Sequence, residues 1–196
     1  MIIKMVRFLM QMNELLSMKF HYKILVIFFV VLFMAGCRKN YVLTEKQQIL
    51  FQYEHIDYSS GYTHEGFYID DEGSIMTYKN PEHWNFHNKD HSIDENLMAE
   101  NISRCTISDN KIGKEELARY SSYINNIASS KITALKGASA DAGTTLYICY
   151  EFVEDIGMYK GSLIKMEGGQ KRENLNFYSK KVSLWLRDIN NTLSEK

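Results

Sequence analysis

The sequence predicts an α+β fold, a mainly antiparallel sheet with helices packed on one face, preceded by a signal peptide. Short runs of apolar and aromatic residues, typical of strands, occur before residue 80 and again between residues 145 and 166. Apolar residues at helical spacing mark 117–127 and 178–193. Because the strands are grouped along the chain instead of alternating with helices, antiparallel pairing is favoured.

Three strands are expected early in the domain, at 48–58, 62–69 and 74–78, where they form an antiparallel meander. Gly66 is expected to mark a β-bulge in the second strand, and Gly73 to close the following hairpin with a positive φ. The first strand sets apolar and aromatic residues in near alternation with polar ones: Ile49, Phe51, Tyr53 and His55 against Gln52 and Glu54.

The segment from Asn80 to about Asp90 is polar and irregular, and we expect Trp84 to lie in this loop, where its removal changes stability little. A short helix is expected at 93–102, anchored by Leu97 and Ile102. A clearer helix follows, with these apolar residues at helical spacing: Leu117, Tyr120, Ile124 and Ile127.

Two more strands are expected at 145–152 and 159–166, followed by a C-terminal helix from about Phe177. Trp185 is the largest side chain of this helix's apolar face, so it is expected to lock the helix onto the sheet and to be costly to remove. The full stripe is Tyr178, Val182, Trp185, Ile189 and Leu193, with Leu186 beside it.

The N-terminal segment has the organisation of an export signal. A basic start, Met18–Lys23, precedes the unbroken apolar run Ile24–Phe33, which is short for a membrane span of roughly 20 residues. Ala35, Gly36 and Cys37 follow, and this small-small-Cys ending resembles the lipobox of bacterial lipoproteins. The resemblance implies cleavage before Cys37 and attachment of lipid to that cysteine, which anchors the protein to a membrane.

We therefore expect a signal peptide at 1–36, a lipidated tether at 37–47 and a single α+β domain at 48–196. Residues 1–17 precede a second basic start, which is unusual for a signal peptide, so translation is expected to begin at Met18.

The charge balance excludes one class of partner. Four of the 23 Lys and Arg but only one of the 24 Asp and Glu precede Cys37, so the chain from Cys37 onward carries a formal charge of −4. Nucleic-acid binding needs a clustered positive face, which this composition disfavours.

Three stretches of the exported part resemble small lipoproteins of unassigned role in Bacteroidetes-type bacteria: Gly66–Gly73, Asp141–Thr144, and the closing run Asn174–Ile189 with Trp185-Leu186. This resemblance implies no activity.

Cys105 and Cys149 remain after Cys37 is assigned to lipid. Export permits a disulfide between them. The alternative is that Cys149, which falls in an apolar strand-like stretch, is a buried free thiol.

Two groups of residues are weak candidates for chemistry. His83, His87 and His91 are spaced by four, and on a helix they would stack three imidazoles that could bind a metal. The other interpretation is a polar loop that happens to be His-rich. A second group on the first hairpin could pair a histidine with a carboxylate across strands for acid–base work, or simply cover a half-exposed sheet: His55, Asp57, His64 and Glu65.

Aromatic residues crowd the first three strands and the segment after them. About half are expected in the core, and the rest are expected to include an exposed patch that stacks on a sugar or a partner protein. The set is Phe51, Tyr53, Tyr58, Tyr62, Phe67, Tyr68, Tyr78, Trp84 and Phe86.

These observations predict a non-enzymatic, lipid-anchored envelope protein that binds a protein or glycan, with no catalytic residue, metal or other cofactor. The alternative is a lipid-tethered metal-binding protein or hydrolase that uses residues 83–91. The tether begins Arg38-Lys39-Asn40, without the acidic residues associated with surface export or inner-membrane retention. The periplasmic face of the outer membrane is therefore expected, if the cell is Gram-negative.

Overall fold

The computed structural model describes residues 46–59, 61–137 and 143–195, all of which belong to one compact unit, Tyr41–Lys196. The predictions about the signal peptide, the start at Met18 and lipidation of Cys37 concern residues outside these ranges.

The described residues form an eight-stranded sheet in which every pairing is antiparallel. The strand order is β4-β7-β6-β1-β2-β3-β5, with β8 paired to β7. The strands are β1 (Ile49–Asp57), β2 (Thr63–Asp70), β3 (Ser74–Lys79), β4 (Ser92–Asp94), β5 (Thr106–Lys111), β6 (Thr144–Val153), β7 (Met158–Gly168) and β8 (Arg172–Glu173). The helices are α2 (Glu95–Ser103), α3 (Lys114–Ser121), α4 (Ile124–Ala128) and α5 (Ser179–Ser194), with a 3₁₀ turn at Glu154–Ile156. The predicted α+β class and the meander of β1, β2 and β3 are confirmed.

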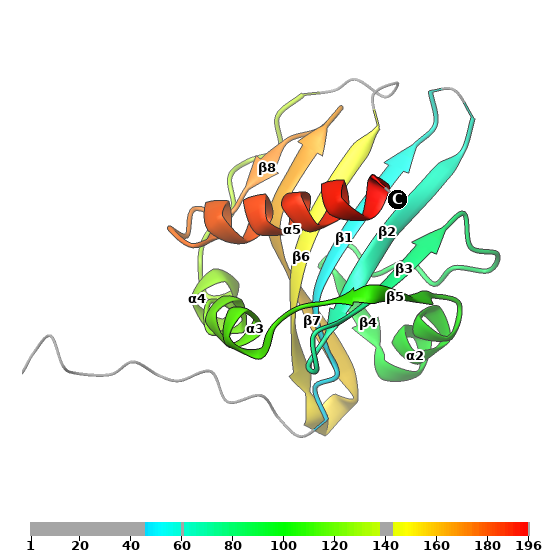
Figure 1. Ribbon diagram of the computed structural model, residues 1–196. Coiled ribbons are helices and arrows are strands. Elements are labelled where there is room, and N and C mark those ends of the chain that lie inside the picture. The colour runs from blue at the N-terminus through cyan, green and yellow to red at the C-terminus, as the bar shows by residue number, and fades with distance from the viewer. Residues whose placement is uncertain (1–45, 60, 138–142, 196) are drawn as a thin grey trace, which may run out of the picture. The chain divides into compact units, whose positions relative to one another are not determined.

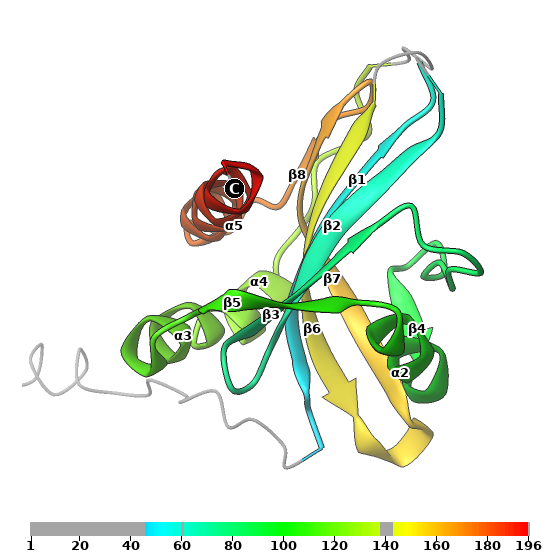
Figure 2. The same ribbon diagram turned by 45° about the vertical axis from the view of Figure 1, so that its right-hand side comes forward.

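The curved sheet has a core on each face. Helices α3, α4 and α5 lie on one side, as expected, whereas α2 lies on the other (Figures 1 and 2). The helix-side core includes Phe51, Phe67, Ile69, Ile124, Ile127, Val182 and Leu186. The opposite core includes Tyr68, Met76, Tyr78, Met98, Ile148, Tyr150 and Leu163. Strand β1 lies near the middle of the sheet, so its side chains are buried on both faces.

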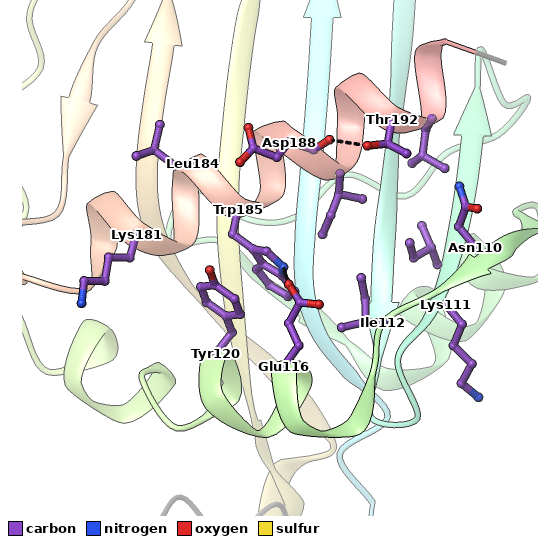
Figure 3. A pocket seen from close by; sticks show the side chains of 13 residues that line it. Asn110, Lys111, Ile112, Glu116, Tyr120, Lys181, Leu184, Trp185, Asp188 and Thr192 are labelled. Atoms are coloured by element: carbon purple, nitrogen blue, oxygen red, sulfur yellow. Dashed lines mark hydrogen bonds between the residues drawn. The ribbon is translucent and has the colours of Figure 1, made fainter.

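Helix α5 holds the sheet through Trp185, as the sequence predicts. The indole ring stacks on Tyr120 of α3 with centroids 4.1 Å apart and meets the Phe51 ring edge-on at 5.2 Å. Its Nε1–H donates to Glu116 Oε1 at 2.8 Å. Glu116, Tyr120 and Trp185 form one side of a cleft of about 550 Å³ between α5 and the β3–β5 edge of the sheet (Figure 3).

Several local predictions were wrong. The helix expected through 117–127 is divided into α3 and α4. Helix α2 is anchored by the buried residues Met98 and Asn101, while Leu97 is 39% exposed. Strands β4, β5 and β8 were not expected, because they are short or mostly exposed and so show no clear apolar alternation.

Candidate functional site

A buried carboxylate marks the most unusual part of the domain. Glu54 is on β1, between Leu146 of β6 and Gly66 of β2 in the sheet register. The residue is only 1% exposed. Burying an ionised carboxylate costs several kcal/mol unless partners compensate, so its surroundings must supply donors or positive charge.

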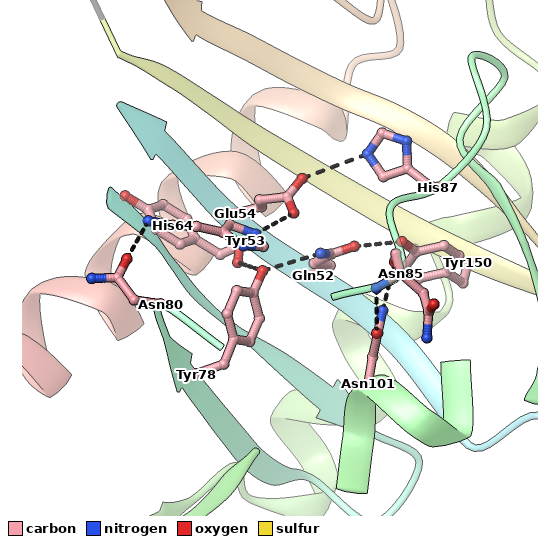
Figure 4. A network of polar contacts seen from close by, with 10 residues as sticks. All are labelled: Gln52, Tyr53, Glu54, His64, Tyr78, Asn80, Asn85, His87, Asn101 and Tyr150. Atoms are coloured by element: carbon pink, nitrogen blue, oxygen red, sulfur yellow. Dashed lines mark hydrogen bonds and ion pairs between the residues drawn. The ribbon is translucent and has the colours of Figure 1, made fainter. Parts of the chain in front are cut away.

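Two histidines supply them (Figure 4). The Nε2 atom of His64, itself 0% exposed, lies 2.8 Å from Glu54 Oε1. The Nε2 atom of His87 lies 3.5 Å from Glu54 Oε2. Burial alone would raise the pKa of Glu54, but the hydrogen bonds and charges of His64 and His87 outweigh it and hold the pKa below its usual range.

The surroundings of His87 require a charged ring. Its Nδ1 lies 3.0 Å from the carbonyl oxygen of Asn88, and its Nε2 faces the Glu54 carboxylate. Both neighbours are acceptors, and a neutral imidazole has only one N–H to offer them. Burial lowers the pKa of His87, but the hydrogen bond to Glu54 and its charge prevail and raise the pKa above its ordinary value. His87 therefore keeps its proton to a higher pH than an ordinary histidine, and its charged form pairs with the Glu54 carboxylate.

A separate directional chain of hydrogen bonds lies beside this pair on the same face of the sheet. The Tyr150 hydroxyl donates to Gln52 Oε1, and Gln52 Nε2 donates to the Tyr78 hydroxyl at 3.1 Å. Tyr78 in turn donates to the carbonyl oxygen of Tyr53 at 3.4 Å. Burial raises the pKa values of Tyr78 and Tyr150 well above 10.0, so both remain protonated donors.

Gly66 makes room for this chain. A Cβ placed on Gly66 would lie 2.7 Å from the Tyr78 hydroxyl oxygen and closer still to the Tyr53 carbonyl. The register between β1 and β2 is regular at Gly66 and shifts only between Ile49 and Phe51, so the bulge predicted at Gly66 is wrong. The glycine is needed because the Tyr78 ring crosses over it.

Residues 80–91, hereafter the cover segment, pack over three buried residues that we call the cluster: Glu54, His64 and Tyr78. Asn80 makes two hydrogen bonds with the backbone of His64. The Asn80 N–H donates to the His64 carbonyl at 2.6 Å, and the Asn80 Oδ1 accepts the backbone N–H of His64 at 2.7 Å. Trp84 contacts Tyr78 with ring centroids 4.2 Å apart, and Phe86 stacks on the His64 ring at 5.2 Å. The prediction that Trp84 can be removed at little cost therefore loses its basis, because the indole ring packs against the core.

The cover segment is also tied to α2. The Asn85 N–H donates to Asn101 Oδ1 at 2.9 Å, and Asn101 Nδ2 donates back to the Asn85 carbonyl at 2.8 Å. Asn101 is fully buried, so both bonds are shielded from water. These two hydrogen bonds fix the middle of the segment without the help of any titratable group.

Left-handed backbone geometry accompanies this packing. Among the described residues, the non-glycine positions with positive φ are Asn80, His83 and His91, at 46°, 55° and 62°. All three lie in the cover segment. Such conformations are strained for most side chains and persist where surrounding contacts enforce them, often near functional sites.

Buried polar atoms without a regular hydrogen bond concentrate in the same place. Within the described ranges they are Glu54 Oε2, His64 Nδ1, His87 Nε2 and His91 Nδ1. Two of them, Glu54 Oε2 and His87 Nε2, face each other at 3.5 Å as an ion pair whose geometry falls short of a regular hydrogen bond. Buried polar groups are normally satisfied, so four exceptions in one place distinguish this site from an ordinary core.

The three sequence candidates for a metal site do not come together. Their segment is irregular, so the interpretation as a polar, His-rich loop is confirmed, and the alternative, a stack of imidazoles on a helix, is not formed. The rings of His87 and His91 lie 4.7 Å apart, whereas His83 is exposed. Among the residues that the structure describes, no group of three or more His, Cys, Asp or Glu side chains has the arrangement of a metal site.

Three of the four candidates on the first hairpin contact other groups and do not form a histidine–carboxylate pair. His55 stands opposite Glu65 in the register, but His55 contacts the Thr145 hydroxyl at 2.9 Å. Glu65 instead pairs with exposed Lys79. Asp57, the remaining carboxylate of the hairpin set, accepts the N–H of Ser59 at 2.8 Å.

Only His64, of the four hairpin candidates, meets a buried carboxylate. That carboxylate is Glu54, which the alternation in the sequence places with Gln52 on the polar side of a strand. The sequence does hold a sign that Glu54 is buried. Tyr68 and Tyr78, on the next two strands, lie on the same face of the sheet as Glu54. Bulky aromatic neighbours indicate a second core on that face and not solvent.

The disulfide considered between Cys105 and Cys149 is not formed, and both thiols are free. Cys149 belongs to the helix-side core, while Cys105 packs against the core on the opposite face. The sheet therefore separates them, and burial raises the pKa of each thiol, that of Cys105 to about 12.

An exposed aromatic patch adjoins the cluster. Tyr58, Tyr62 and Phe86 are 66%, 48% and 52% exposed. The Tyr58 and Tyr62 rings lie 5.4 Å apart, and both Tyr62 and Phe86 contact the His64 ring. The other aromatic candidates are buried, or half-buried in the case of Trp84: Phe51, Tyr53, Phe67, Tyr68, Tyr78 and Trp84. The expected division between core and exposed patch is confirmed.

The chain matches no protein-family model, and no curated protein or solved structure is significantly similar to it. None of the helices in the described part of the chain is long and apolar enough to cross a membrane.

Proposed function

We propose that this protein is a lipid-anchored envelope protein that binds a glycan or protein partner through the aromatic patch and catalyses no reaction. The observation that carries the proposal is the exposure of Tyr58, Tyr62 and Phe86 together, beside an otherwise well-packed aromatic cluster. Exposed aromatic rings supply large contact areas at low conformational cost, which is why they are enriched in binding surfaces.

The patch is preorganised. One face of the Phe86 ring stacks on the buried His64 ring with an interplanar angle of 28°, so Phe86 is held in place while about half its surface remains open. Tyr58 and Tyr62 come from the ends of the paired strands β1 and β2 and support each other. A platform of this kind suits either a sugar ring or an apolar side chain of a partner.

Binding is favoured over acid–base catalysis because the acid–base groups are closed off. A catalytic base must come within hydrogen-bond reach of its substrate. Glu54 and His64 are 1% and 0% exposed and are engaged with each other. They therefore support the patch from below and do not present a proton-transfer site at the surface.

The proposed anchor depends on the sequence between Met18 and Cys37, whose small-small-Cys ending implies lipid on Cys37. We expect labelled palmitate to enter the wild-type chain and not the Cys37→Ser variant, which shifts to the soluble fraction or remains as precursor. Label that still enters the variant would show that Cys37 is not the lipid site.

Binding is tested with the Tyr62→Ala/Phe86→Ala double variant. Phe177→Ala is the matched control, because Phe177 is 75% exposed but belongs to the segment before α5. Each full-length chain, in detergent, is incubated with purified cell-wall glycan in one arm and with envelope proteins in the other. The double variant should lose at least about tenfold in affinity in one arm, equivalent to ~1.4 kcal/mol, while Phe177→Ala retains it. Equal binding by all three chains, or no binding in either arm, would exclude the patch as the binding surface.

A further inference from the structure

The cover segment is held by two kinds of contact that respond differently to pH. Its start and middle are fixed by amide and backbone groups, at Asn80 with His64 and at Asn85 with Asn101. Its last part carries two histidines, His87 over Glu54 and His91 beside it. Among the residues of the segment that hold it in place, His87 and His91 are the ones with imidazole side chains, which change charge near neutral pH.

His87 must be protonated to fit, because both of its ring nitrogens face oxygen acceptors. Loss of the proton would leave a nitrogen lone pair directed at the Glu54 carboxylate, or would break the contact with the Asn88 carbonyl. Either change replaces an attraction with a repulsion, so deprotonation loosens the segment over Glu54.

His91 has the opposite requirement. Burial, the charge of His87 and the charge of Arg172 together lower the pKa of His91 to about 4, against weaker opposing effects of Glu54 and Asp90. The buried Nδ1 atom of His91 has no acceptor. A proton on His91 would place a second cation 4.7 Å, centroid to centroid, from the His87 ring.

We propose that residues 80–91 form a pH-gated cover, closed most firmly near neutral pH and loosened by both acid and alkali. As the pH rises, His87 releases its proton and the cover loses its ion pair with Glu54. As the pH falls, His91 gains a proton against His87, and at still lower pH Glu54 becomes neutral.

The pKa shifts of His87, His91 and Glu54 set how the stability of the closed cover changes on the alkaline side and on the acid side of neutral pH, hereafter the alkaline limb and the acid limb. The raised pKa of His87 means that its stabilisation is complete below about 6.5 and is lost as pH rises through the folded-state value. The lowered pKa of His91 means that stability falls as pH drops from about 6.5 toward about 4. The lowered pKa of Glu54 adds a loss below its ordinary 4.5.

Besides His64, which is bonded to Glu54 Oε1, the groups that face the cluster are tyrosines and Asp90, which keep their charge across this range. Burial raises the pKa of Tyr62, Tyr68, Tyr78 and Tyr150, so they remain neutral. The pKa of Asp90 is lowered by its bonds to Ser92, so it remains an anion.

Opening would also displace Phe86 from its stack on His64, and so would disassemble the aromatic patch. This regulatory consequence rests on the proposed function, but the opening itself does not. A pH-dependent cover on a protein whose patch binds nothing would remove the regulation and leave the conformational inference intact.

Trp84 reports the cover directly, since it lies within the segment and contacts Tyr78. In a Trp185→Phe background it is the remaining tryptophan, and its quenching by neutral acrylamide is followed from about pH 4 to about pH 9 while circular dichroism monitors global folding. Quenching should be lowest near neutral pH and increase on both sides. Each pKa unit of coupling corresponds to a tenfold change in the ratio of closed to open cover.

Three variants of the full chain assign the limbs. His87→Gln retains a neutral donor and should remove the alkaline limb. His91→Asn, which tolerates the left-handed backbone, should remove the acid limb above about pH 4.5. His83→Asn is the control, because His83 is exposed and left-handed in the same segment, and it should leave both limbs unchanged.

Quenching of Trp84 that does not change with pH in the folded wild-type protein would overturn the proposal. So would an alkaline limb that persists in His87→Gln or an acid limb that persists in His91→Asn. Limbs that coincide with global unfolding would also refute it. If the Trp185→Phe background fails to fold, hydrogen exchange of the wild-type peptide 80–91 decides instead. Its protection, corrected for intrinsic exchange and compared with β6, should peak near neutral pH; uniform protection would refute the cover.

Discussion

Replacing Trp185 with alanine tests how the C-terminal helix is held. The residue is 6% exposed, and its ring contacts Phe51 and Tyr120 from two elements. Removing a buried tryptophan costs about 3–5 kcal/mol. The indole borders the open cleft of about 550 Å³, so water can enter the space that it leaves. We therefore expect the lower part of that range, about 3–4 kcal/mol.

That loss is a large part of the ~5–15 kcal/mol that stabilises a domain of this size. At roughly 2–4 °C per kcal/mol, the thermal midpoint should fall by about 6–16 °C. Trp185→Phe keeps a ring against Tyr120, so it retains most of the packing and loses the bond from Nε1 to Glu116 together with the smaller part of the indole surface. Glu116 is half-buried and can rehydrate, so the second variant should cost only about 1 kcal/mol.

The assay is urea unfolding of each full-length chain in mild detergent, followed by circular dichroism. The slope of the transition should remain constant while the midpoint falls in the order wild type, Trp185→Phe, Trp185→Ala. If Trp185→Ala unfolds at the wild-type midpoint, α5 does not depend on this side chain, and the stripe would have to be interpreted as a binding surface.

Three further predictions concern the opposite face of the sheet and the proposed anchor. Trp84→Ala should cost about 2 kcal/mol by the same unfolding assay, because its half-buried ring packs on Tyr78; a negligible loss would place it in solvent. Gly66→Ala should cost about 1–3 kcal/mol by forcing Tyr78 aside, while Gly113→Ala, with open space around the added Cβ, should be nearly neutral; equal effects would contradict the close packing. Protease added to intact cells should spare the domain until the outer membrane is permeabilised, and cleavage beforehand would place it on the cell surface.

The sequence predicts those elements whose local pattern matches their final surroundings. Strands β2, β6 and β7 and helix α5 each carry a strong apolar period, and their positions are confirmed to within a few residues. Strand β5 could not be predicted in this way. It pairs with β3 at the edge of the sheet and is largely exposed, so it is held by backbone bonds and not by buried side chains.

The candidate site was missed for a different reason. The alternation in β1 correctly predicts a strand, but a half-buried strand of this pattern would have its polar residues in solvent. Glu54 is buried because β6 pairs with β1 across about 90 residues of sequence and because the cover segment returns over the same face. Neither event leaves a mark within β1 itself. The burial of a strand's second face is a property of topology, which local periodicity does not encode.

A comparison of Glu167 with Glu54 shows why only the Glu54 ion pair responds to pH near neutrality. Glu167 pairs with Lys165 at 2.6 Å and with Arg187 at 2.7 Å and accepts the Tyr147 hydroxyl. Partial burial would raise the pKa of Glu167, yet these three partners lower it to about 2. Lysine and arginine keep their protons far above neutral pH, so this pair stays charged wherever the protein is folded.

Glu54 is buried more deeply, but its partners are histidines. The ionisation of an imidazole changes close to neutral pH, and a small shift of its pKa moves the transition within the physiological range. A lysine or arginine at position 87 would give a firmer ion pair with the same carboxylate and abolish the alkaline limb. The presence of His87 over Glu54 is therefore the feature that makes the cover segment sensitive to pH, and Glu167 serves as the internal comparison for a pair that only stabilises.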